Sequence, residues 1–414
     1  MNTELFIARR LHFDENGGQR MSRPAMRVAT AGIAVGLTVM LVAVAVVVGF
    51  KREVSNQIVG FGSHIQVAAY ENGYGYETMP IVPSDSLVQT LKTLPHIKCV
   101  QRITTKPGIV KTDTDFEGIV LKGVDAGFDW TFFKTHIVAG NIPVVGGDVA
   151  ANDALISRHT ANLLHLAVGD RFTAYFVGES VRARRFTVCG IYETAFADFD
   201  KLFVLTDMRH VQKLNGWNGG QISQLELLID DFGRLDETER EVFFATAGAT
   251  QPEGTLMQTR SIKKIVPRMF EWLDMLDVNA WVILALMLAV AGFNMISGLL
   301  IIILERTSTI GLLKALGARN RSIRKIFICQ AAFLIGKGMF WGNVAGCAIV
   351  LAERFTHAIP LDAAMYYVNY VPVSLGVGHW LLINAGTFAL TLLMLVAPSH
   401  IITSIRPSQS IKFD

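Results

Sequence analysis

Strongly apolar stretches occur once near the N-terminus and three times in the last third of the chain. Residues 28–50 contain no ionisable side chain, and a helix of that length, rising ~1.5 Å per residue, can cross a hydrocarbon core of ~30 Å. Three further apolar stretches cover residues 281–304, 326–351 and 379–402. The pattern predicts a membrane α-helical protein with four transmembrane helices, arranged as one plus three.

A segment with the mixed pattern of a folded, water-exposed domain separates the first transmembrane helix from the other three. This segment, residues 51–280, is long enough to bury its own core, so we expect a large α+β extracytoplasmic domain. The predicted strands are residues 63–69, 117–123, 171–176 and 184–191. The predicted helices are one that ends at residue 94, with Ser84 and Asp85 as candidate caps, one that ends at residue 164 and is capped by Ser157, and residues 236–245.

The end of this domain has the periodicity of an amphipathic helix that runs into the second transmembrane helix. Pro267 marks either the first turn of this helix or a kink. The helix is either a stiff lever that carries motion or a simple connecting stalk, and the sequence is compatible with both. Its apolar positions are Ile265, Met269, Trp272, Leu273 and Leu276.

The distribution of basic residues predicts the orientation. Five Lys or Arg residues lie in residues 1–27, six in residues 305–325 and two in residues 403–414, against Arg354 alone in residues 352–378. Because short cytoplasmic segments are enriched in Lys and Arg, both termini are predicted to be cytoplasmic. Residues 1–27 then form a cytoplasmic N-terminal segment before a retained anchor, residues 352–378 an extracytoplasmic loop and residues 403–414 a cytoplasmic tail.

Composition supports a membrane protein and excludes several other classes. The 414 residues are 51% hydrophobic and 18% charged, and the net charge of +3 is too small for a nucleic-acid partner. The four cysteines do not form a disulfide framework. Cys99 and Cys189 lie in the same predicted domain, where they either pair or remain two separate buried thiols.

The chain lacks the usual signatures of catalysis and metal binding. It contains no HExxH, GxSxG, paired CxxC or EF-hand pattern, and its ten histidines have no ligand spacing. Gly336, Lys337 and Gly338 do not form a P-loop, because no GxxxxGK[ST] pattern is present. We predict no catalytic residue, no metal site and no cofactor bound by this chain.

The segment between the second and third transmembrane helices is predicted to be a short amphipathic helix. Ile310, Leu313 and Leu316 lie beside basic residues, and Gly317 is a C-terminal stop signal. Such a helix can lie on anionic lipid or receive a cytoplasmic partner. The candidate partner-binding residues are Glu305, Arg306, Ile310, Leu313, Lys314, Leu316 and Gly317.

Small residues and one charge distinguish positions inside the membrane helices. Glycines that recur every four residues either allow close helix packing or are simply tolerated in the membrane. Lys337 lies near the middle of the third span, so it should face a partner or water, as a functional group, a snorkelling side chain or part of a structural pair. The spaced glycines are Gly32 and Gly36 in the first span, and Gly338, Gly342 and Gly346 in the third.

Several segments together resemble one family of permeases. The segment ERTSTIGLLKALGARNRSIRKIF, residues 305–327, resembles the coupling-helix loop of FtsX/MacB-type permeases. Over essentially the whole chain the sequence resembles the lipoprotein-releasing permeases of the LolC/LolE family. LFIARR at 5–10 resembles the elbow helix of this family, which implies that residues 1–27 form an amphipathic elbow and residues 352–378 a periplasmic loop. The other supporting segments are GFKREV at 49–54, LKGVDA at 121–126, residues 154–176, 184–204 and 272–287, and the tail 405–414.

The resemblance implies a multi-pass permease of the bacterial inner membrane that works with a separate ABC ATPase. Two ATPase subunits would hold ATP and Mg, and a second permease, identical or paralogous, would complete the transporter. The substrate would be an acylated lipoprotein that is passed to a periplasmic carrier. From helix identity, the candidate walls of a lipid cavity are Val39, Met40, Val42, Val46, Met287, Val290, Phe293 and Met295.

Two alternatives belong to related systems. One is an FtsX-like scaffold that transmits ATP-driven motion to an extracytoplasmic partner, and the other is a MacB-like efflux permease. Residues 154–204 resemble the lipoprotein-releasing family more than the smaller outer domain expected of a division scaffold. MacB-like exporters usually carry a fused N-terminal ATPase, whereas only residues 1–27 precede the first span here.

Overall fold

The computed structural model describes residues 22–70, 76–112, 115–178, 180–249 and 255–399. Most of the predicted elbow and the whole predicted tail lie outside these residues. The chain divides into two compact units. The membrane unit comprises residues up to Arg52, Leu273–Pro360 and the chain from Tyr370 onward, whereas the outer domain comprises Glu53–Trp272 and Leu361–Asn369.

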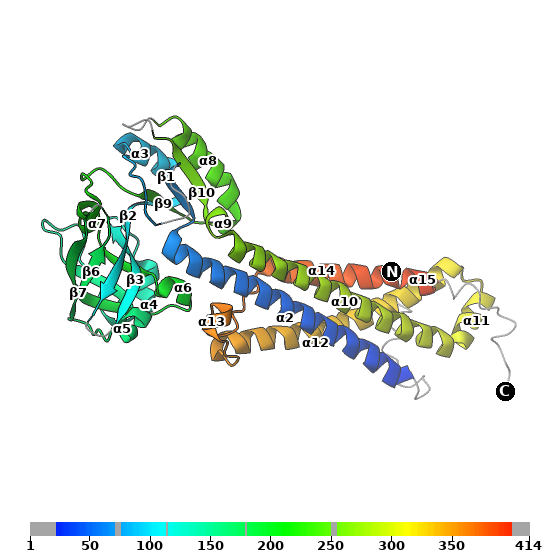
Figure 1. Cartoon of the computed structure of the whole chain (residues 1–414). Helices are drawn as coiled ribbons and strands as arrows, with labels where there is room; N and C mark the ends of the chain where they lie inside the picture. The colour runs from blue at the N-terminus through cyan, green and yellow to red at the C-terminus, as the bar shows by residue number, and fades with distance from the viewer. Residues whose placement is uncertain (1–21, 71–75, 113–114, 179, 250–254, 400–414) are drawn as a thin grey trace. The chain divides into compact units, whose positions relative to one another are not determined.

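Four helices of the described chain are long and apolar enough to span a membrane (Figure 1). Three of them extend beyond the predicted spans, because a helix continues past the apolar boundary until a cap or breaker ends it. The third begins at Asn320, so the predicted loop 305–325 is shorter than expected. The four helices are α2 (Ser22–Gly62), α10 (Pro267–Glu305), α12 (Asn320–Thr356) and α14 (Val377–Met394).

The fourth predicted span is not a single helix over residues 379–402. Helix α14 ends at Met394, and the short α15 (Val396–Ser399) follows it. Pro398 explains the break, because a proline ring clashes with the carbonyl four residues earlier, here that of Met394. Residues 400–402 lie outside the described chain.

The membrane unit has an apolar core and an apolar exterior. Ile33 of α2, Met295 of α10 and Phe327 of α12 meet in one buried cluster. Outward-facing Trp281 and Leu382 are 72% and 73% exposed. Helices that are apolar both on their packed faces and on their exposed faces are typical of a protein that is surrounded by lipid.

Over its described residues the outer domain is built on one mixed sheet of ten strands, and all four predicted strands are present. The strand order is β10-β1-β9-β2-β3-β8-β5-β7-β4, and β6 pairs with both β2 and β7. The path β2-β3-β8-β5-β7-β6 therefore returns to β2 and closes a ring around an apolar core. The strands are β1 (Ile65–Ala69), β2 (Ile97–Lys111), β3 (Phe116–Val124), β4 (Ile137–Gly140), β5 (Asp153–Ser157), β6 (Arg171–Phe176), β7 (Arg182–Tyr192), β8 (Phe203–Asp207), β9 (Gln224–Ile229) and β10 (Met257–Ser261).

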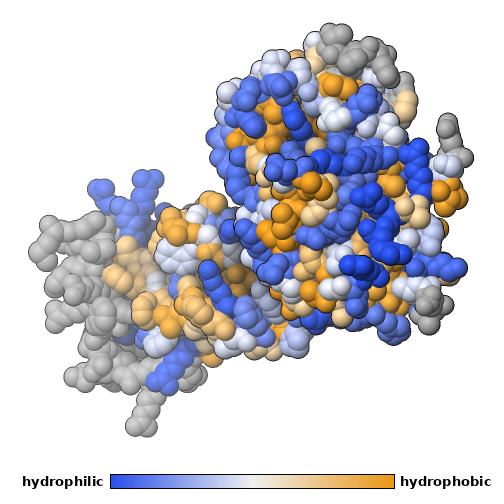
Figure 2. Space-filling view, turned by 90° about the vertical axis from the view of Figure 1, so that its left-hand side faces the viewer, coloured by the Kyte–Doolittle hydropathy of each residue, from blue (hydrophilic) through white to orange (hydrophobic). Residues whose placement is uncertain are grey.

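Helices cover the sheet, and the predicted caps are confirmed. The Ser84 side chain accepts a hydrogen bond from Leu87 N, and Ser157 accepts one from Thr160 N. Figure 2 looks onto this domain and shows mostly hydrophilic side chains with hydrophobic groups between them, as in a water-exposed domain. The helices are α3 (Asp85–Thr93), α4 (Thr131–His136), α5 (Arg158–Leu163), α6 (Ala197–Asp200), α7 (Met208–Asn215), the 3-10 turn η1 (Phe232–Arg234), α8 (Leu235–Ala247), α9 (Ile262–Ile265) and α13 (Ala363–Tyr366).

The predicted stalk helix is the first part of α10. Pro267 lies at its first position, where a missing N–H costs nothing. Ile265 belongs instead to the preceding short helix α9. Phe270 of α10 is buried and stacks on Phe232, with ring centroids 5.9 Å apart, so the stalk is packed onto the outer domain.

Candidate functional site

The predicted amphipathic segment between the second and third spans is helix α11 (Thr307–Ala315). Its end forms a Schellman motif: Ala318 N donates to Leu313 O, and Gly317 N donates to Lys314 O, both at 3.0 Å. Gly317 has φ of +87°, a conformation that glycine adopts without strain. The predicted stop at Gly317 is therefore confirmed.

Of the three apolar residues predicted to share one face of this helix, Ile310 and Leu313 face the core, whereas Leu316 does not. Ile310 is fully buried, and Leu313 packs against the core of the membrane unit. Leu316 lies beyond the helix and is 76% exposed, and Leu312 is 55% exposed. Leu316 is exposed because α11 ends at Ala315, and Leu312 is exposed because it lies on the opposite side of α11 from Ile310. Arg306 and Lys314 are half-buried.

The glycine rows lie where membrane helices come closest. On α12, a Cβ added to Gly342 would lie 2.8 Å from Ala34 O of α2, and one added to Gly338 would lie 2.9 Å from Thr30 O. Thr38 of α2 donates from Oγ1 to Gly342 O at 3.1 Å. Small residues permit this approach of two backbones. A Cβ at Gly346 would meet the side chain of Leu41, also on α2.

The first glycine row packs α2 against α10. A Cβ at Gly32 would lie 2.5 Å from the amide nitrogen of Asn294, and one at Gly36 would be in ordinary contact with Met287 O. Close packing therefore accounts for Gly32 and for the row on α12, whereas the space at Gly36 would accept a methyl group.

The candidate lipid-cavity residues divide into three groups. Met40 and Met295 are buried within the packed core of the unit, so they do not face an open space in this chain. Val290 and Phe293 are 43% and 71% exposed on α10. The half-buried candidates are Val39, Val42, Val46 and Met287.

The polar groups of the spans include residues that the sequence analysis overlooked. Lys337 is exposed on α12. Asn343 Nδ2 of α12 donates to Asn384 Oδ1 of α14 at 2.7 Å, and Trp380 Nε1 donates to Asn343 Oδ1 at 2.7 Å. Interhelical hydrogen bonds of this kind join helices where apolar packing gives no advantage over lipid. The sequence signal that could have revealed this contact was the presence of two asparagines, Asn343 and Asn384, within apolar stretches.

A buried ion pair joins strands β3 and β9 of the outer domain. Lys122 and Glu226 are 3% and 4% exposed, and Lys122 Nζ lies 2.9 and 2.8 Å from the two carboxylate oxygens. The same ammonium donates to Phe61 O in the last turn of α2, where helix carbonyls lack partners. The pair lines a cavity of about 330 Å³ together with Tyr76 and Thr105.

Aromatic rings enclose the end of α2. The Phe61 ring is 1% exposed and contacts Phe132, Phe133 and Phe199 at centroid separations of 5.5, 5.7 and 5.2 Å. Tyr192 is also in contact with Phe61, at 6.1 Å. The end of the first membrane helix is therefore fixed both by the backbone carbonyl of Phe61 and by the ring of Phe61.

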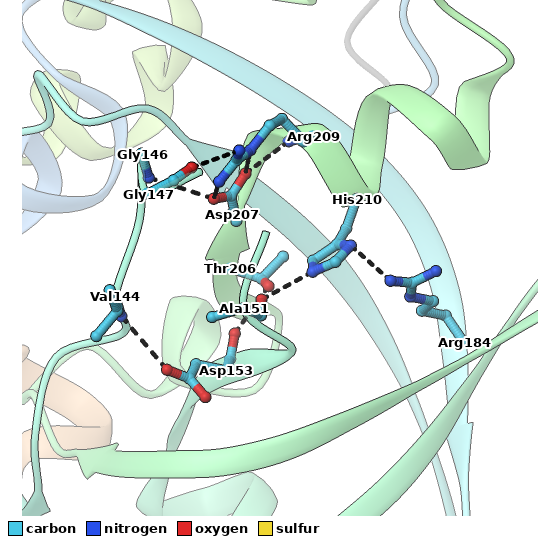
Figure 3. A network of polar contacts seen from close by, with 10 residues as sticks. All are labelled: Val144, Gly146, Gly147, Ala151, Asp153, Arg184, Thr206, Asp207, Arg209 and His210. Atoms are coloured by element: carbon cyan, nitrogen blue, oxygen red, sulfur yellow. Dashed lines mark hydrogen bonds and ion pairs between the residues drawn. The ribbon is translucent and has the colours of Figure 1, made fainter. Parts of the chain in front are cut away.

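A polar network fixes the long loop between β4 and β5 to the start of α7 (Figure 3). Asp207 accepts from Gly146 N at 3.3 Å and from Arg209 at 2.7 Å, while Arg209 also donates to Gly147 O. Burial alone would raise the pKa of Asp207, but the hydrogen bonds from Arg209 and Gly146 outweigh it and lower the pKa. The carboxylate therefore remains charged and holds the loop.

His210 extends this network as a neutral side chain (Figure 3). Its Nε2 lies 2.8 Å from Ala151 O, and Arg184 donates to its Nδ1 at 2.9 Å. Burial and the positive charge of Arg184 lower the pKa of His210. This arrangement requires the proton on Nε2. The network therefore has a structural role, which is to hold the loop between β4 and β5 in place.

The two cysteines of the outer domain are separate thiols, which was one of the two alternatives. Cys189 Sγ donates to Ala154 O at 3.3 Å, and Cys99 Sγ lies 3.7 Å from Gly127 O. Burial and the nearby Asp153 raise the pKa of Cys189 to about 12, which makes it unreactive at neutral pH.

Comparisons with known proteins identify both units. Residues 28–242, more than half of the chain, match the family model of the MacB-like periplasmic core domain. Residues 281–407 match the model of the FtsX-like permease C-terminal region. The order of the two matches is that expected of a one-plus-three permease with a large domain after the first span.

Two relatives match this chain over nearly the whole of both sequences, and a third over part of its length. The Neisseria meningitidis lipoprotein-releasing system transmembrane protein LolC is 21% identical, with 94% of each chain covered. The Haemophilus influenzae LolE of the same system is 23% identical, with 99% of each chain covered. The Pseudomonas fluorescens pyoverdine export ATP-binding/permease protein PvdT is 25% identical over 77% of this chain and 48% of its own length. The chain belongs to the LolC/LolE family of permeases, with a MacB-like periplasmic core domain followed by an FtsX-like C-terminal region.

Proposed function

We propose that this protein is a permease subunit of an ATP-driven ABC transporter that extracts lipoproteins from the inner membrane for transfer towards the outer membrane. The observation that carries the proposal is the end-to-end similarity to proteins named for lipoprotein release, over 94% and 99% of the chain. The four candidate spans and the folded outer domain supply the parts that such a task requires.

The physical difficulty of the task is the acyl anchor. Each buried CH₂ contributes ~0.8 kcal/mol, so one long chain is retained by roughly 10 kcal/mol, and passive release into water is very slow. A permease must instead offer an apolar surface that accepts the chains. The exposed Val290 and Phe293 and the half-buried Val39, Val42, Val46 and Met287 are suitable for this role. Met40 and Met295 instead hold the helices together.

The energy for extraction would come from separate ATPase subunits, since the sequence contains no P-loop. Two such subunits would bind ATP and Mg, and a second permease would pair with this one. Helix α11 would receive the ATPase on the cytoplasmic side, mainly through the exposed Leu312 and Leu316. Both termini would then be cytoplasmic, and the outer domain would hold the periplasmic carrier.

The two alternatives receive less support. The comparison with the pyoverdine exporter covers less than half of that protein's length. The FtsX-like match covers residues 281–407, which leaves the outer domain to the MacB-like model. Neither comparison extends over the whole of both chains as the LolC and LolE comparisons do.

Depletion of the protein tests the proposal directly. After depletion, inner and outer membranes are separated and acylated lipoproteins are measured in each fraction. We expect lipoproteins destined for the outer membrane to accumulate in the inner membrane. Normal delivery, or accumulation of a small exported molecule with normal delivery, would overturn the proposal. Re-expression from a plasmid is the control for secondary effects of depletion.

A further inference from the structure

The loop that connects α12 to α14, residues 357–376, is divided between the two units. Its central segment, Leu361–Asn369, belongs to the outer domain by its contacts, although both flanking segments belong to the membrane unit. The segment is internally ordered: Asp362 caps α13, and Leu361 N donates to Asn369 O at 3.0 Å. A folded loop of this kind can transmit a displacement, which an unstructured linker cannot.

Within the outer domain, a row of aromatic rings joins this segment to the end of α2. Phe61 stacks on Phe199 at 5.2 Å, Phe199 stacks on Phe196 at 4.7 Å, and Phe196 meets Tyr367 at 4.7 Å. Tyr367 in turn contacts Trp272 of α10 at 6.2 Å. Three segments that continue into membrane helices therefore meet in one aromatic row.

The backbone conformation of Tyr367 independently indicates that the aromatic ring of this residue is needed at this position. Tyr367 has φ of +60° at the C-terminal cap of α13, a left-handed conformation usually taken by glycine or asparagine. A large side chain in this region is energetically unfavourable, and such residues concentrate at functional positions. Phe196, the ring it meets, is 1% exposed.

The other end of the same loop is fixed to α2 within the membrane unit. Ser374 N donates to Ala45 O at 2.9 Å. A Cβ at Gly49 would lie 2.3 Å from Pro372 O, so the loop backbone lies directly on the helix surface. The loop thus has one attachment in each unit, through Tyr367 and through Pro372 with Ser374.

We propose that Tyr367 and Phe196 are positioning residues for transport, which make the loop of residues 357–376 a third mechanical connection to the outer domain, beside α2 and α10. The proposal rests on the proposed function, since it assigns these residues to the ATP-driven stroke. Movement of α12 and α14 would reach the row of rings through Tyr367, and not only through the two continuous helices.

Amide hydrogen exchange of the full-length protein in nanodiscs tests the attachment without any transport assay. Tyr367→Gly removes the ring and relieves the backbone, so it separates loss of the contact from strain. We expect exchange of peptides within residues 361–369 to rise roughly five- to tenfold, the range that one aromatic contact supports. Tyr367→Phe keeps the ring and should behave as the wild type, as should Tyr366→Ala, whose side chain is 44% exposed. Unchanged exchange in Tyr367→Gly would overturn the proposal.

The coupling itself is measured in proteoliposomes as lipoprotein released per ATP hydrolysed by the whole complex. Tyr367→Gly should lower this ratio roughly threefold or more with ATP hydrolysis retained, and Tyr367→Phe should restore it. An unchanged ratio, including one produced by an equal fall of hydrolysis and release, would show that the ring has no positioning role. Absence of release by the wild-type complex would contradict the proposed function instead, and the exchange result would then decide the attachment.

Discussion

Lys122 Nζ and the Glu226 carboxylate form a buried ion pair, 2.8 Å apart at the closer oxygen, that also caps the last turn of α2 through Phe61 O. All three ammonium protons have an acceptor, and Gln224 Nε2 donates to Glu226 Oε1 at 2.8 Å. A buried pair is tolerated when its remaining hydrogen-bonding groups are satisfied in this way. The end of the first membrane helix therefore depends on two strands of the outer domain.

The first prediction follows from this pair. Lys122→Met leaves the Glu226 carboxylate buried and uncompensated, which should cost about 3–5 kcal/mol of stability. The double variant Lys122→Met with Glu226→Leu should recover most of the loss, because no buried charge remains. Thermal unfolding of the purified protein measures both. A single variant as stable as the wild type would show that the pair does not hold the domain together.

The second prediction concerns the contact of α2 with α12. Gly342→Ala places a methyl group 2.8 Å from Ala34 O, so the helices must separate, at a cost of about 1–3 kcal/mol. Gly336→Ala on the same helix meets nothing within 4 Å and is the matched control. Both substitutions replace glycine with alanine within α12, so they raise the helix propensity equally. Equal melting temperatures for the two variants would contradict close packing at Gly342.

The third prediction uses the burial of His64. Burial and the positive charge of Lys98 lower the pKa of His64 to about 4, against about 6.5 in the unfolded chain. Between these values the unfolded state binds a proton that the native state does not, so stability falls as pH decreases from about 6.5 to 4. The loss attributable to His64 should reach about 3 kcal/mol.

His64→Gln should therefore be less sensitive to acid than the wild type. Asp200 acts in the opposite direction, because burial raises its pKa to about 6 despite hydrogen bonds from Thr194, so it favours the native state at lower pH. Comparison of wild type with His64→Gln cancels the Asp200 contribution. His159→Gln on the exposed surface is the control. Parallel curves of stability against pH would refute the assignment to His64.

The fourth prediction corrects the expected role of Leu313 on α11. Leu313→Asp should destabilise the membrane unit itself, because this side chain packs against its core. Leu312→Asp should leave the melting temperature unchanged and weaken binding of the ATPase about tenfold or more, the effect of losing one buried leucine contact. Ser308→Asp adds the same charge at another exposed position of α11. Co-purification of the ATPase and its stimulation by the permease are the measurements. Normal co-purification of Leu312→Asp would remove α11 from the interface.

Much of the architecture could be predicted because apolar runs and caps are local signals. The four spans, the Ser84 and Ser157 caps and the stop at Gly317 were all predicted from short stretches of sequence. Strand β2 was missed because Pro107 and Gly108 lie within it. At Pro107 the strand pairs with β3 on one side; on the other side its pairing with β9 ends at Ile103 and its pairing with β6 begins at Ile109. The missing N–H is therefore tolerated in the gap between two partners.

The site was less predictable, because its parts are joined by contacts between distant residues. Lys122 and Glu226 are 104 positions apart, and Phe196 and Tyr367 come from segments that share no local pattern. Leu313 and Leu316 have the same hydropathy in the sequence, yet one faces the core and the other is exposed. Side-chain direction near a helix end depends on where the helix stops and on which neighbour it meets.

The closed path of six strands in the outer domain affects how this domain interacts with unfolded polypeptides. Open sheets present unpaired N–H and C=O groups to which a foreign strand can add, and this is a route to aggregation. In the ring from β2 through β6, each strand has a neighbour on both sides along at least part of its length. This half of the domain can meet partly unfolded polypeptides without offering them a template for strand addition.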